Sequence, residues 1–234
     1  MRKGLRSVFG RWAAAGLLSS MSLLAQEVYR GGPQGQGFYF RGGIGPEVSQ
    51  RTDVTEFFGP VSGINVKYDP GFRISAAAGY MFCNYFSAEL EAGVLYNSIK
   101  SITGSPGTDA ALANFPMMVN AVFHFPLEGN FVPYVGFGGG ASSSILTIDR
   151  ATINGPSGSA SLNGEDSDVV WALQGFAGFR YEFNDRMAVG FGYKFLATGE
   201  PSWDVFSFNS GAAGQLRFDK ARTHSFIAEF TMKF

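Results

Sequence analysis

The chain has 234 residues, of which 45% are apolar and 15% aromatic, while only 16% are charged against roughly 25% in soluble proteins. This balance argues against a water-covered globular surface, and the aromatic content excludes disorder because it can bury enough apolar area to offset chain entropy. The glycines follow no three-residue period, which excludes collagen, and the formal net charge of −1 gives no electrostatic reason to expect a nucleic-acid partner.

The first predicted element is a secretory signal peptide. Residues 1–12 contain four basic residues and no acid, residues 13–24 are uncharged and largely apolar, and Ala25 is a small residue at the cleavage position. The apolar stretch is too short to cross a hydrocarbon core, which needs ~20 residues. We therefore predict three parts, namely a signal peptide, a periplasmic N-terminal segment and a membrane domain, at residues 1–25, 26–36 and 37–234.

Alternation of apolar and polar residues recurs along the exported part of the chain, whereas helical periodicity does not. Leu90 and Val94, for example, fall on one face of a strand, and Glu89 and Glu91 fall on the other. The same rule predicts eight strands, at about 37–45, 71–81, 85–96, 114–125, 131–142, 169–182, 187–196 and 223–234.

The connections between these strands alternate in length. Three are short, and the other four are long and rich in Gly, Ser, Asn, Asp and Pro, at 46–70, 97–113, 143–168 and 197–222. This rhythm over an even number of strands predicts an all-β fold, an eight-stranded antiparallel up-and-down transmembrane β-barrel with two unlike ends. The N-terminus and the short turns would face the periplasm, and the four long loops would face outside.

The two faces of the strands differ in volume and charge. One face carries most of the Phe residues, which the narrow interior of an eight-stranded barrel cannot hold, so this face should meet lipid. The other face carries small residues and nearly balanced charges. These predict a lumen charge network of Arg41, Arg73, Glu89, Glu91, Arg180, Glu182, Lys194, Glu229 and Lys233. Because unpaired interior charge is expensive, we expect these groups to form ion pairs.

The order of these features resembles the small eight-stranded outer-membrane barrels of Gram-negative bacteria, the OmpA-like and opacity-type surface proteins. The resemblance covers the whole exported chain. It rests on the runs Gly-Phe-Tyr-Phe-Arg-Gly-Gly at 37–43, Phe-Val-Pro-Tyr-Val-Gly-Phe-Gly-Gly-Gly at 131–140 and Thr-His-Ser-Phe at 223–226. It implies location in the outer membrane, in contact with outer-membrane lipid and lipopolysaccharide.

The resemblance also gives a meaning to the end of the chain. The alternating Phe230, Met232 and Phe234 look like the C-terminal signal that the barrel-insertion machinery recognises in this family. The chain stops at the eighth strand, so we expect no peptidoglycan-binding domain and do not carry over anchoring to the cell wall. Because one chain supplies all eight strands, we expect a monomer.

No residue pattern predicts a catalytic, cofactor or metal site. Cys83 is the only cysteine and there are two histidines, which leaves metal chemistry few ligands. Residues 136–141 match the Gly-x-Gly-x-x-Ala dinucleotide fingerprint, but that motif requires a following helix, and a second strand pattern follows here. We interpret these glycines as lumen residues. For the acidic segment 150–168, we favour a solvated loop over a ligand or calcium site.

The predicted function is structural and interactive: an integral outer-membrane protein that supports membrane integrity and contacts a host or surface ligand through its loops. One alternative is a narrow porin or a carrier of a small apolar ligand. A second alternative is a lipid A-modifying enzyme, suggested by His224 and Ser225, although adjacent strand residues point to opposite faces and cannot pair directly. His124 is the other histidine available to such an enzyme.

Overall fold

The computed structural model describes residues 36–103, 105, 108–155, 158–206 and 213–234, so the predicted signal peptide and nearly all of the predicted periplasmic segment lie outside the described residues. The described residues form strands and no helix. In this part of the chain, no helix of the length and apolarity needed to span a bilayer is present. The strands are β1 (Gly37–Ser49), β2 (Thr52–Phe57), β3 (Asn65–Tyr68), β4 (Gly71–Cys83), β5 (Phe86–Ile102), β6 (Thr108–His124), β7 (Phe131–Gly155), β8 (Gly158–Glu182), β9 (Met187–Thr198), β10 (Ser202–Phe206), β11 (Ala213–Phe218) and β12 (Arg222–Lys233).

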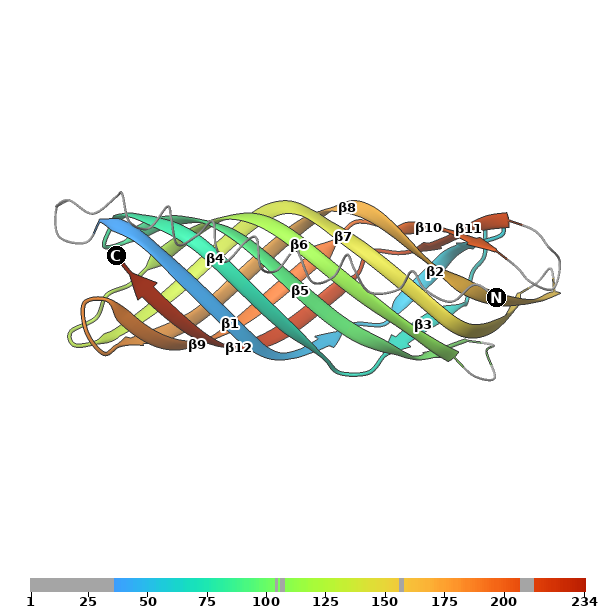
Figure 1. Cartoon of the computed structure of the whole chain (residues 1–234), viewed down its shortest axis with the longest axis horizontal. Coiled ribbons are helices and arrows are strands. Elements are labelled where there is room, and N and C mark those ends of the chain that lie inside the picture. The colour runs from blue at the N-terminus through green and yellow to red at the C-terminus, as the bar shows by residue number, and fades with distance from the viewer. Residues whose placement is uncertain (1–35, 104, 106–107, 156–157, 207–212) are drawn as a thin grey trace, which may run out of the picture. The chain divides into compact units, whose positions relative to one another are not determined.

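Eight of these strands close a ring (Figure 1). The order around the ring is β1–β4–β5–β6–β7–β8–β9–β12, every neighbouring pair is antiparallel, and β12 returns to β1 with Ile44 opposite Ala228. Closure leaves the ring without an edge strand, so its backbone groups are paired within the sheet. The prediction of an eight-stranded antiparallel barrel is confirmed.

The structure corrects the predicted loops. Segments 46–70 and 197–222 contain four additional short strands, β2, β3, β10 and β11, and segment 143–168 is almost entirely the extended β7–β8 hairpin. Four to six residues give too little periodicity to identify a strand, because such short strands form through packing and pairing rather than through local propensity. The interpretation of 150–168 as a solvated loop is therefore wrong.

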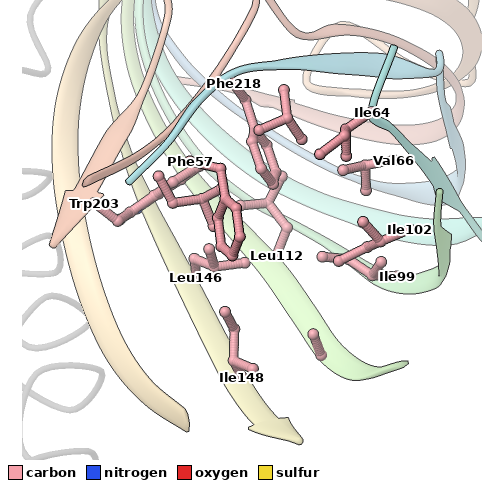
Figure 2. Close-up of a cluster of buried hydrophobic side chains, with 13 residues drawn as sticks. Phe57, Ile64, Val66, Ile99, Ile102, Leu112, Leu146, Ile148, Trp203 and Phe218 are labelled. Carbon is pink, nitrogen blue, oxygen red and sulfur yellow. The ribbon is translucent and has the colours of Figure 1, made fainter. Parts of the chain in front are cut away.

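The added strands extend the wall at the long-connection end of the ring and form a part of the same compact unit that we call the cap. It consists of β2, β3, β10 and β11 together with the ends of β5, β6 and β7 that extend past the ring, in the sheet order β10–β11–β2–β3–β5. Its core is one apolar cluster (Figure 2), made of Val54, Phe57, Ile64, Val66, Ile99, Ile102, Ala110, Leu112, Leu146, Ile148, Trp203, Leu216 and Phe218. Full burial of each large side chain contributes about 1.5–3 kcal/mol, which explains why strands this short are held in place.

The exterior face changes composition where the ring ends and the cap begins. Along β5 the exterior positions run from Leu90, 59% exposed, and Tyr96, 40% exposed, to Lys100 in the cap, whose side chain is 65% exposed. An apolar belt followed by charged residues is the pattern of a wall that leaves lipid and enters water. The ring is thus the segment suited to a membrane, and the cap lies beyond it.

An aromatic band lies at the short-turn end of the ring over β4, β5 and β6. Ring centroids follow one another at 5.1 Å from Tyr80 to Phe82, at 5.6 Å from Phe82 to Phe86 and at 5.3 Å from Phe86 to Phe123. Such contacts contribute about 0.5–1.5 kcal/mol beyond the area they bury. The aromatic side chains therefore form a connected band rather than a scatter of residues with high β-propensity.

Candidate functional site

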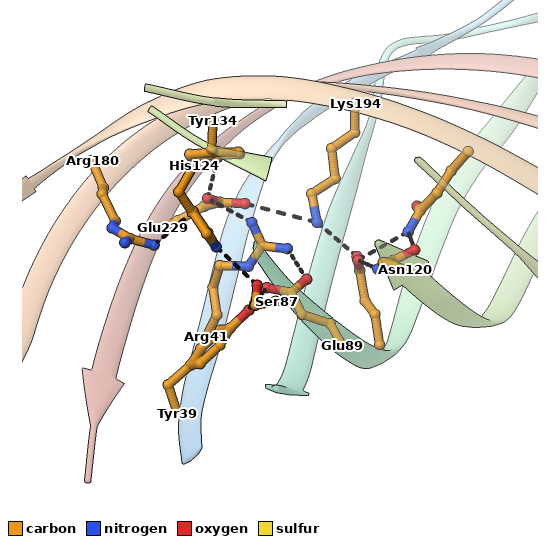
Figure 3. A network of polar contacts seen from close by, with 12 residues as sticks. Tyr39, Arg41, Ser87, Glu89, Asn120, His124, Tyr134, Arg180, Lys194 and Glu229 are labelled. Atoms are coloured by element: carbon orange, nitrogen blue, oxygen red, sulfur yellow. Dashed lines mark hydrogen bonds and ion pairs between the residues drawn. The ribbon is translucent and has the colours of Figure 1, made fainter. Parts of the chain in front are cut away.

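The lumen of the ring holds a network of polar and charged side chains (Figure 3). Strand alternation turns every second residue inward, and the inward positions include Arg73, Glu91 and Lys194, which are 0%, 1% and 1% exposed. Arg41, Glu89, Arg180 and Glu229 are also buried. In contrast, Glu182 and Lys233 are partly exposed, at the short-turn end.

The first group of contacts centres on Glu91. One of its carboxylate oxygens accepts from Lys194 Nζ at 2.7 Å and from Arg73 at 3.0 Å. The other oxygen accepts from the amide nitrogens of Asn120 at 2.9 Å and Gln174 at 3.0 Å. Four strong donors fill this carboxylate, and two of them are cations, so its charge is compensated inside the barrel.

The second group centres on Arg41, one step nearer the short turns. Its guanidinium is paired with Glu89 and, at 3.3 Å, with Glu229. Glu229 also accepts from the Tyr134 hydroxyl at 2.5 Å and lies 3.7 Å from Lys194 Nζ. The contact between Glu229 and Lys194 joins the two groups into one network.

A chain of hydrogen bonds leads from the second group to the short-turn end. Arg180 can only donate, so it donates to His124 Nδ1 at 3.3 Å, and the proton of His124 must sit on Nε2. That nitrogen then donates to Ser87 Oγ at 2.8 Å, Ser87 donates to the Tyr39 hydroxyl at 2.8 Å, and Tyr39 donates to Glu89 at 2.7 Å. All donors therefore point in one direction, from the guanidinium toward the carboxylate.

The hydrogen-bond chain bears directly on catalysis. A serine nucleophile needs a histidine nitrogen that accepts its proton, but the nitrogen of His124 that faces Ser87 is a donor. Ser87 is fully buried and His124 is 2% exposed. The pair therefore has the spacing of a nucleophile and base without the protonation state or the access that the reaction requires.

His224 and Ser225 lie on opposite faces of β12, as expected for adjacent strand residues. Ser225 points into the lumen and is fully buried, whereas His224 is on the exterior face of β12, where its Nδ1 lies 2.6 Å from the Tyr193 hydroxyl. His124 contacts Ser87 and Arg180 instead. Cys83, at the end of β4, is exposed.

The remaining predicted charges lie at the rim. Glu182 accepts from Arg180 Nε at 3.0 Å and from Lys233 Nζ at 2.7 Å. All nine predicted lumen charges thus make ion pairs with one another, in two linked interior groups and this rim group. Their role in function is taken up below as a proposal.

The sequence did not predict that aromatic side chains lie inside the lumen. Phe176 is 5% exposed, and its ring lies 5.2 Å from Lys194 Nζ and 5.3 Å from the Arg41 guanidinium carbon. It fits because Gly136 lies opposite it on β7, where a Cβ would overlap the ring. Tyr39 and Tyr134 are likewise inward and buried. Strand alternation places these residues on the inward face and could have identified them, but their large side chains favoured the exterior face.

The network is followed by an apolar layer toward the cap. On three strands, the next inward residue after a network member is apolar: Met118 after Asn120, Ala172 after Gln174, and Leu196 after Lys194. With Leu95 these residues form one buried cluster. Above it, the indole nitrogen of Trp203 donates to the Ser144 carbonyl at 2.9 Å, which ties the cap core to the wall. Ion pairs, the apolar layer and the cap core thus follow one another along the axis, with buried polar residues such as Asn97 and Asn114 between the apolar layer and the cap core.

Among the described residues, no group of three or more His, Cys, Asp or Glu side chains could hold a metal ion. Side chains of residues 149–165 are not described, so the suggested calcium site in that segment is only partly covered by this statement. Asp166 and Asp168, which are described, accept backbone hydrogen bonds from β10 at 2.7 and 2.9 Å.

Comparison with known proteins identifies the class. The sequence matches the outer membrane protein beta-barrel domain over residues 13–234 and therefore belongs to this family. It is an outer-membrane protein, as the resemblance implied, and the transmembrane barrel fold places its ring in the bilayer.

Solved structures agree with this fold. The outer membrane protein OprG from Pseudomonas aeruginosa is 17% identical with a TM-score of 0.61, over 87% of this chain and 98% of that one. The outer membrane protease OmpT from Escherichia coli is 9% identical with a TM-score of 0.55, over 89% of this chain and 99% of that one. A search of curated proteins gave no match.

Proposed function

We propose that the protein is a sealed barrel whose role is structural and interactive: it strengthens the outer membrane and presents its cap, on the outside, to a host or surface ligand. The observation that carries this proposal is the filled axis. Ion-paired side chains around Glu91 and Arg41 are followed by the layer of Leu95 and Met118 and then by the apolar core of the cap. A lumen filled in this way favours a structural role over a role as a channel.

The cap supports the interactive part of the proposal. Its strands alternate between buried apolar residues and exposed polar residues, such as Asp53, Thr55, Lys67 and Lys100. The apolar side fixes the strands, and the polar side forms a surface of defined shape in water. A surface that is ordered before binding loses less conformational entropy when a partner docks.

Conductance tests the sealed-barrel proposal. Refolded protein that shows heat-modifiable gel migration is added to a planar bilayer, and we expect no reproducible unitary current. A defined unitary conductance of the wild-type protein would instead favour the porin alternative. Replacement of the central groups, Arg73→Ala with Glu91→Ala and Lys194→Ala, provides the comparison, because it removes side chains from the lumen while leaving the ring closed.

Adhesion tests the interactive part. Bacteria that display the wild-type protein are compared with bacteria displaying a Lys67→Ser, Lys100→Ser double variant, on cultured epithelial cells and on abiotic surfaces. We expect adherence to cells to fall for the cap variant and to stay unchanged for Leu90→Ala, a control on the lipid-facing belt. The proposal would be contradicted if bacteria with the wild-type protein, the cap variant, the Leu90→Ala control or no barrel at all adhered equally well to the epithelial cells.

Two further inferences follow from the position of residues in the ring. Phe230, Met232 and Phe234 are 47%, 42% and 40% exposed at the end of the last strand, which supports a role as the signal for the barrel-insertion machinery. Closure of the ring within one chain supports a monomer. The lipid A-modifying alternative gains no support from Ser87 and His124, because the proton on His124 Nε2 faces the serine.

A further inference from the structure

A groove crosses the exterior face of the ring over β8, β9, β12 and β1. It has a volume of about 500 Å³ and an almost wholly apolar lining. Small residues interrupt the bulky belt here: Ala228 lies in register between Ile44 on β1 and Phe191 on β9. In the next row toward the cap, Phe226 is opposite Tyr193. The groove therefore has a low floor with apolar side chains standing on its sides.

A polar cluster ends the groove on the side of the cap. His224 follows Phe226 on the same exterior face, and its Nε2 lies 2.7 Å from the amide nitrogen of Gln50. Because that amide donates, the proton of His224 is on Nδ1 and is donated to the Tyr193 hydroxyl at 2.6 Å. The hydroxyl hydrogen of Tyr193 then has no acceptor among the described residues. Tyr193 is 37% exposed, so this hydrogen is free to be donated to a group outside the protein.

Two arginines lie close to this cluster in the chain. Arg222 is exposed on the exterior face of β12, two residues from His224, and its carbonyl accepts from the backbone N–H of Gln50 at 2.8 Å. Arg51, the next residue after Gln50, is also exposed. Within the described part of the chain, neither guanidinium has an acidic partner within 4.0 Å. Unpaired guanidinium groups at a membrane boundary favour phosphate.

The length of the site matches one leaflet. Ala228 is six residue steps along β12 from Arg222, or ~20 Å along a strand, and a strand tilt of ~40° reduces this to ~15 Å of depth. That is half of a hydrocarbon core of ~30 Å. A lipid acyl chain that begins at the level of Arg222 and spans one leaflet therefore ends at the middle of the bilayer, on the floor of the groove.

We propose that this groove and cluster bind one outer-leaflet lipid that carries a phosphate on its headgroup. An acyl chain lies over Ala228 between Ile44 and Phe191, Arg222 and Arg51 bind the phosphate, and Tyr193 donates to a headgroup oxygen. The site rests on the orientation given in the proposed function, with the cap outside, and does not depend on the cap binding a host or on a sealed lumen.

Lipid retention tests the site. Full-length refolded barrel in detergent is titrated with lipid A, with dephosphorylated lipid A and with inorganic phosphate, and the bound species are resolved by native mass spectrometry. We expect one lipid A to bind per barrel. Dephosphorylated lipid A should bind about tenfold more weakly, as for loss of a charge-assisted contact. Inorganic phosphate should not bind measurably, since it lacks the acyl chain.

Two matched pairs of variants decide the result. Ala228→Phe fills the floor of the groove and Arg222→Gln removes a guanidinium, and each should weaken lipid A binding about tenfold. Ala92→Phe, on the exterior of β5, and Lys67→Gln, in the cap, make the same changes elsewhere and should bind as the wild type does. Equal retention by all four variants, or equal loss in the controls, would mean nonspecific annular lipid and would overturn the site. Heat-modifiable migration shows that each variant is folded.

Discussion

Asp166 on β8 accepts a hydrogen bond of 2.7 Å from the backbone N–H of Asp204 on β10. Asp168 does the same for Ser202 at 2.9 Å. In the sheet order, β10 is the edge strand of the cap, and an unpaired edge is a site for unwanted strand addition. Two carboxylates thus cover an edge that no neighbouring strand pairs with in the cap sheet.

Loss of these carboxylates should loosen the cap and leave the ring intact. We expect Asp166→Ala with Asp168→Ala to cost about 1 kcal/mol of local stability for each lost hydrogen bond. The amides of Ser202 and Asp204 should then exchange faster with solvent, as measured by hydrogen exchange. Asp185→Ala, in an exposed short turn, is the control. Unchanged protection in the double variant would mean that pairing with β11 and packing of Trp203 hold β10 without the two carboxylates.

Removal of the Glu91 carboxylate should destabilise the ring strongly. Arg73 would remain buried without its acidic partner and Lys194 would keep only Glu229 at 3.7 Å, and breaking a buried ion pair in this way costs about 3–5 kcal/mol. Urea unfolding of Glu91→Ala in detergent, followed by tryptophan fluorescence, measures the loss. Glu182→Ala at the partly exposed rim is the comparison and should lose less than about 1 kcal/mol. Similar losses in the two variants would contradict a special role for the central group.

Substitution by alanine should destabilise the barrel at Gly138 of β7 but not at the adjacent Gly139. A Cβ on Gly138 would overlap the Asn120 amide and the backbone of β6, whereas a Cβ on Gly139 would meet Leu173 at an ordinary 3.5 Å. We expect Gly138→Ala to cost about 3 kcal/mol by overpacking and Gly139→Ala to be nearly neutral. Gel migration after heating and refolding yield compare the two. If both fold equally well, the close contact of Gly138 with Asn120 and the backbone of β6 is wrong.

High pH should weaken the cap through Tyr68. Burial raises the pKa of this phenol from 10.0 to about 12, so the folded cap holds the proton more tightly than the unfolded chain does. The resulting stabilisation is complete below pH 10 and is lost as the pH rises to about 12. The difference in tyrosinate absorbance between wild type and Tyr68→Phe should titrate near the raised value. A difference curve centred near pH 10 would exclude burial of the hydroxyl.

The ring could be predicted because its physics is local. On β5, the alternation of Leu90 and Val94 with Glu89 and Glu91 specifies the two faces without knowledge of any neighbour. Charge balance among the inward residues then indicated that they would pair, and volume placed most Phe residues outside.

The cap and the neutral members of the network could not be predicted in this way. Val66 lies in a strand of four residues that is stable because it packs with Phe218 and Ile102, which come from distant parts of the chain. Likewise, nothing in the sequence distinguishes Asn120 or Gln174 from any other inward polar residue. Their contacts with Glu91 depend on the register among three strands, which periodicity does not give.

The separation of faces in the cap also affects how its sequence can change. Lys67 and Val66 are neighbours in the chain, but one faces water and the other is fully buried. Substitutions at exterior positions such as Lys67 and Lys100 can therefore accumulate without disturbing the core beneath them. The fold thus allows the exposed residues of the cap to be substituted while the buried residues that hold its strands in place are kept.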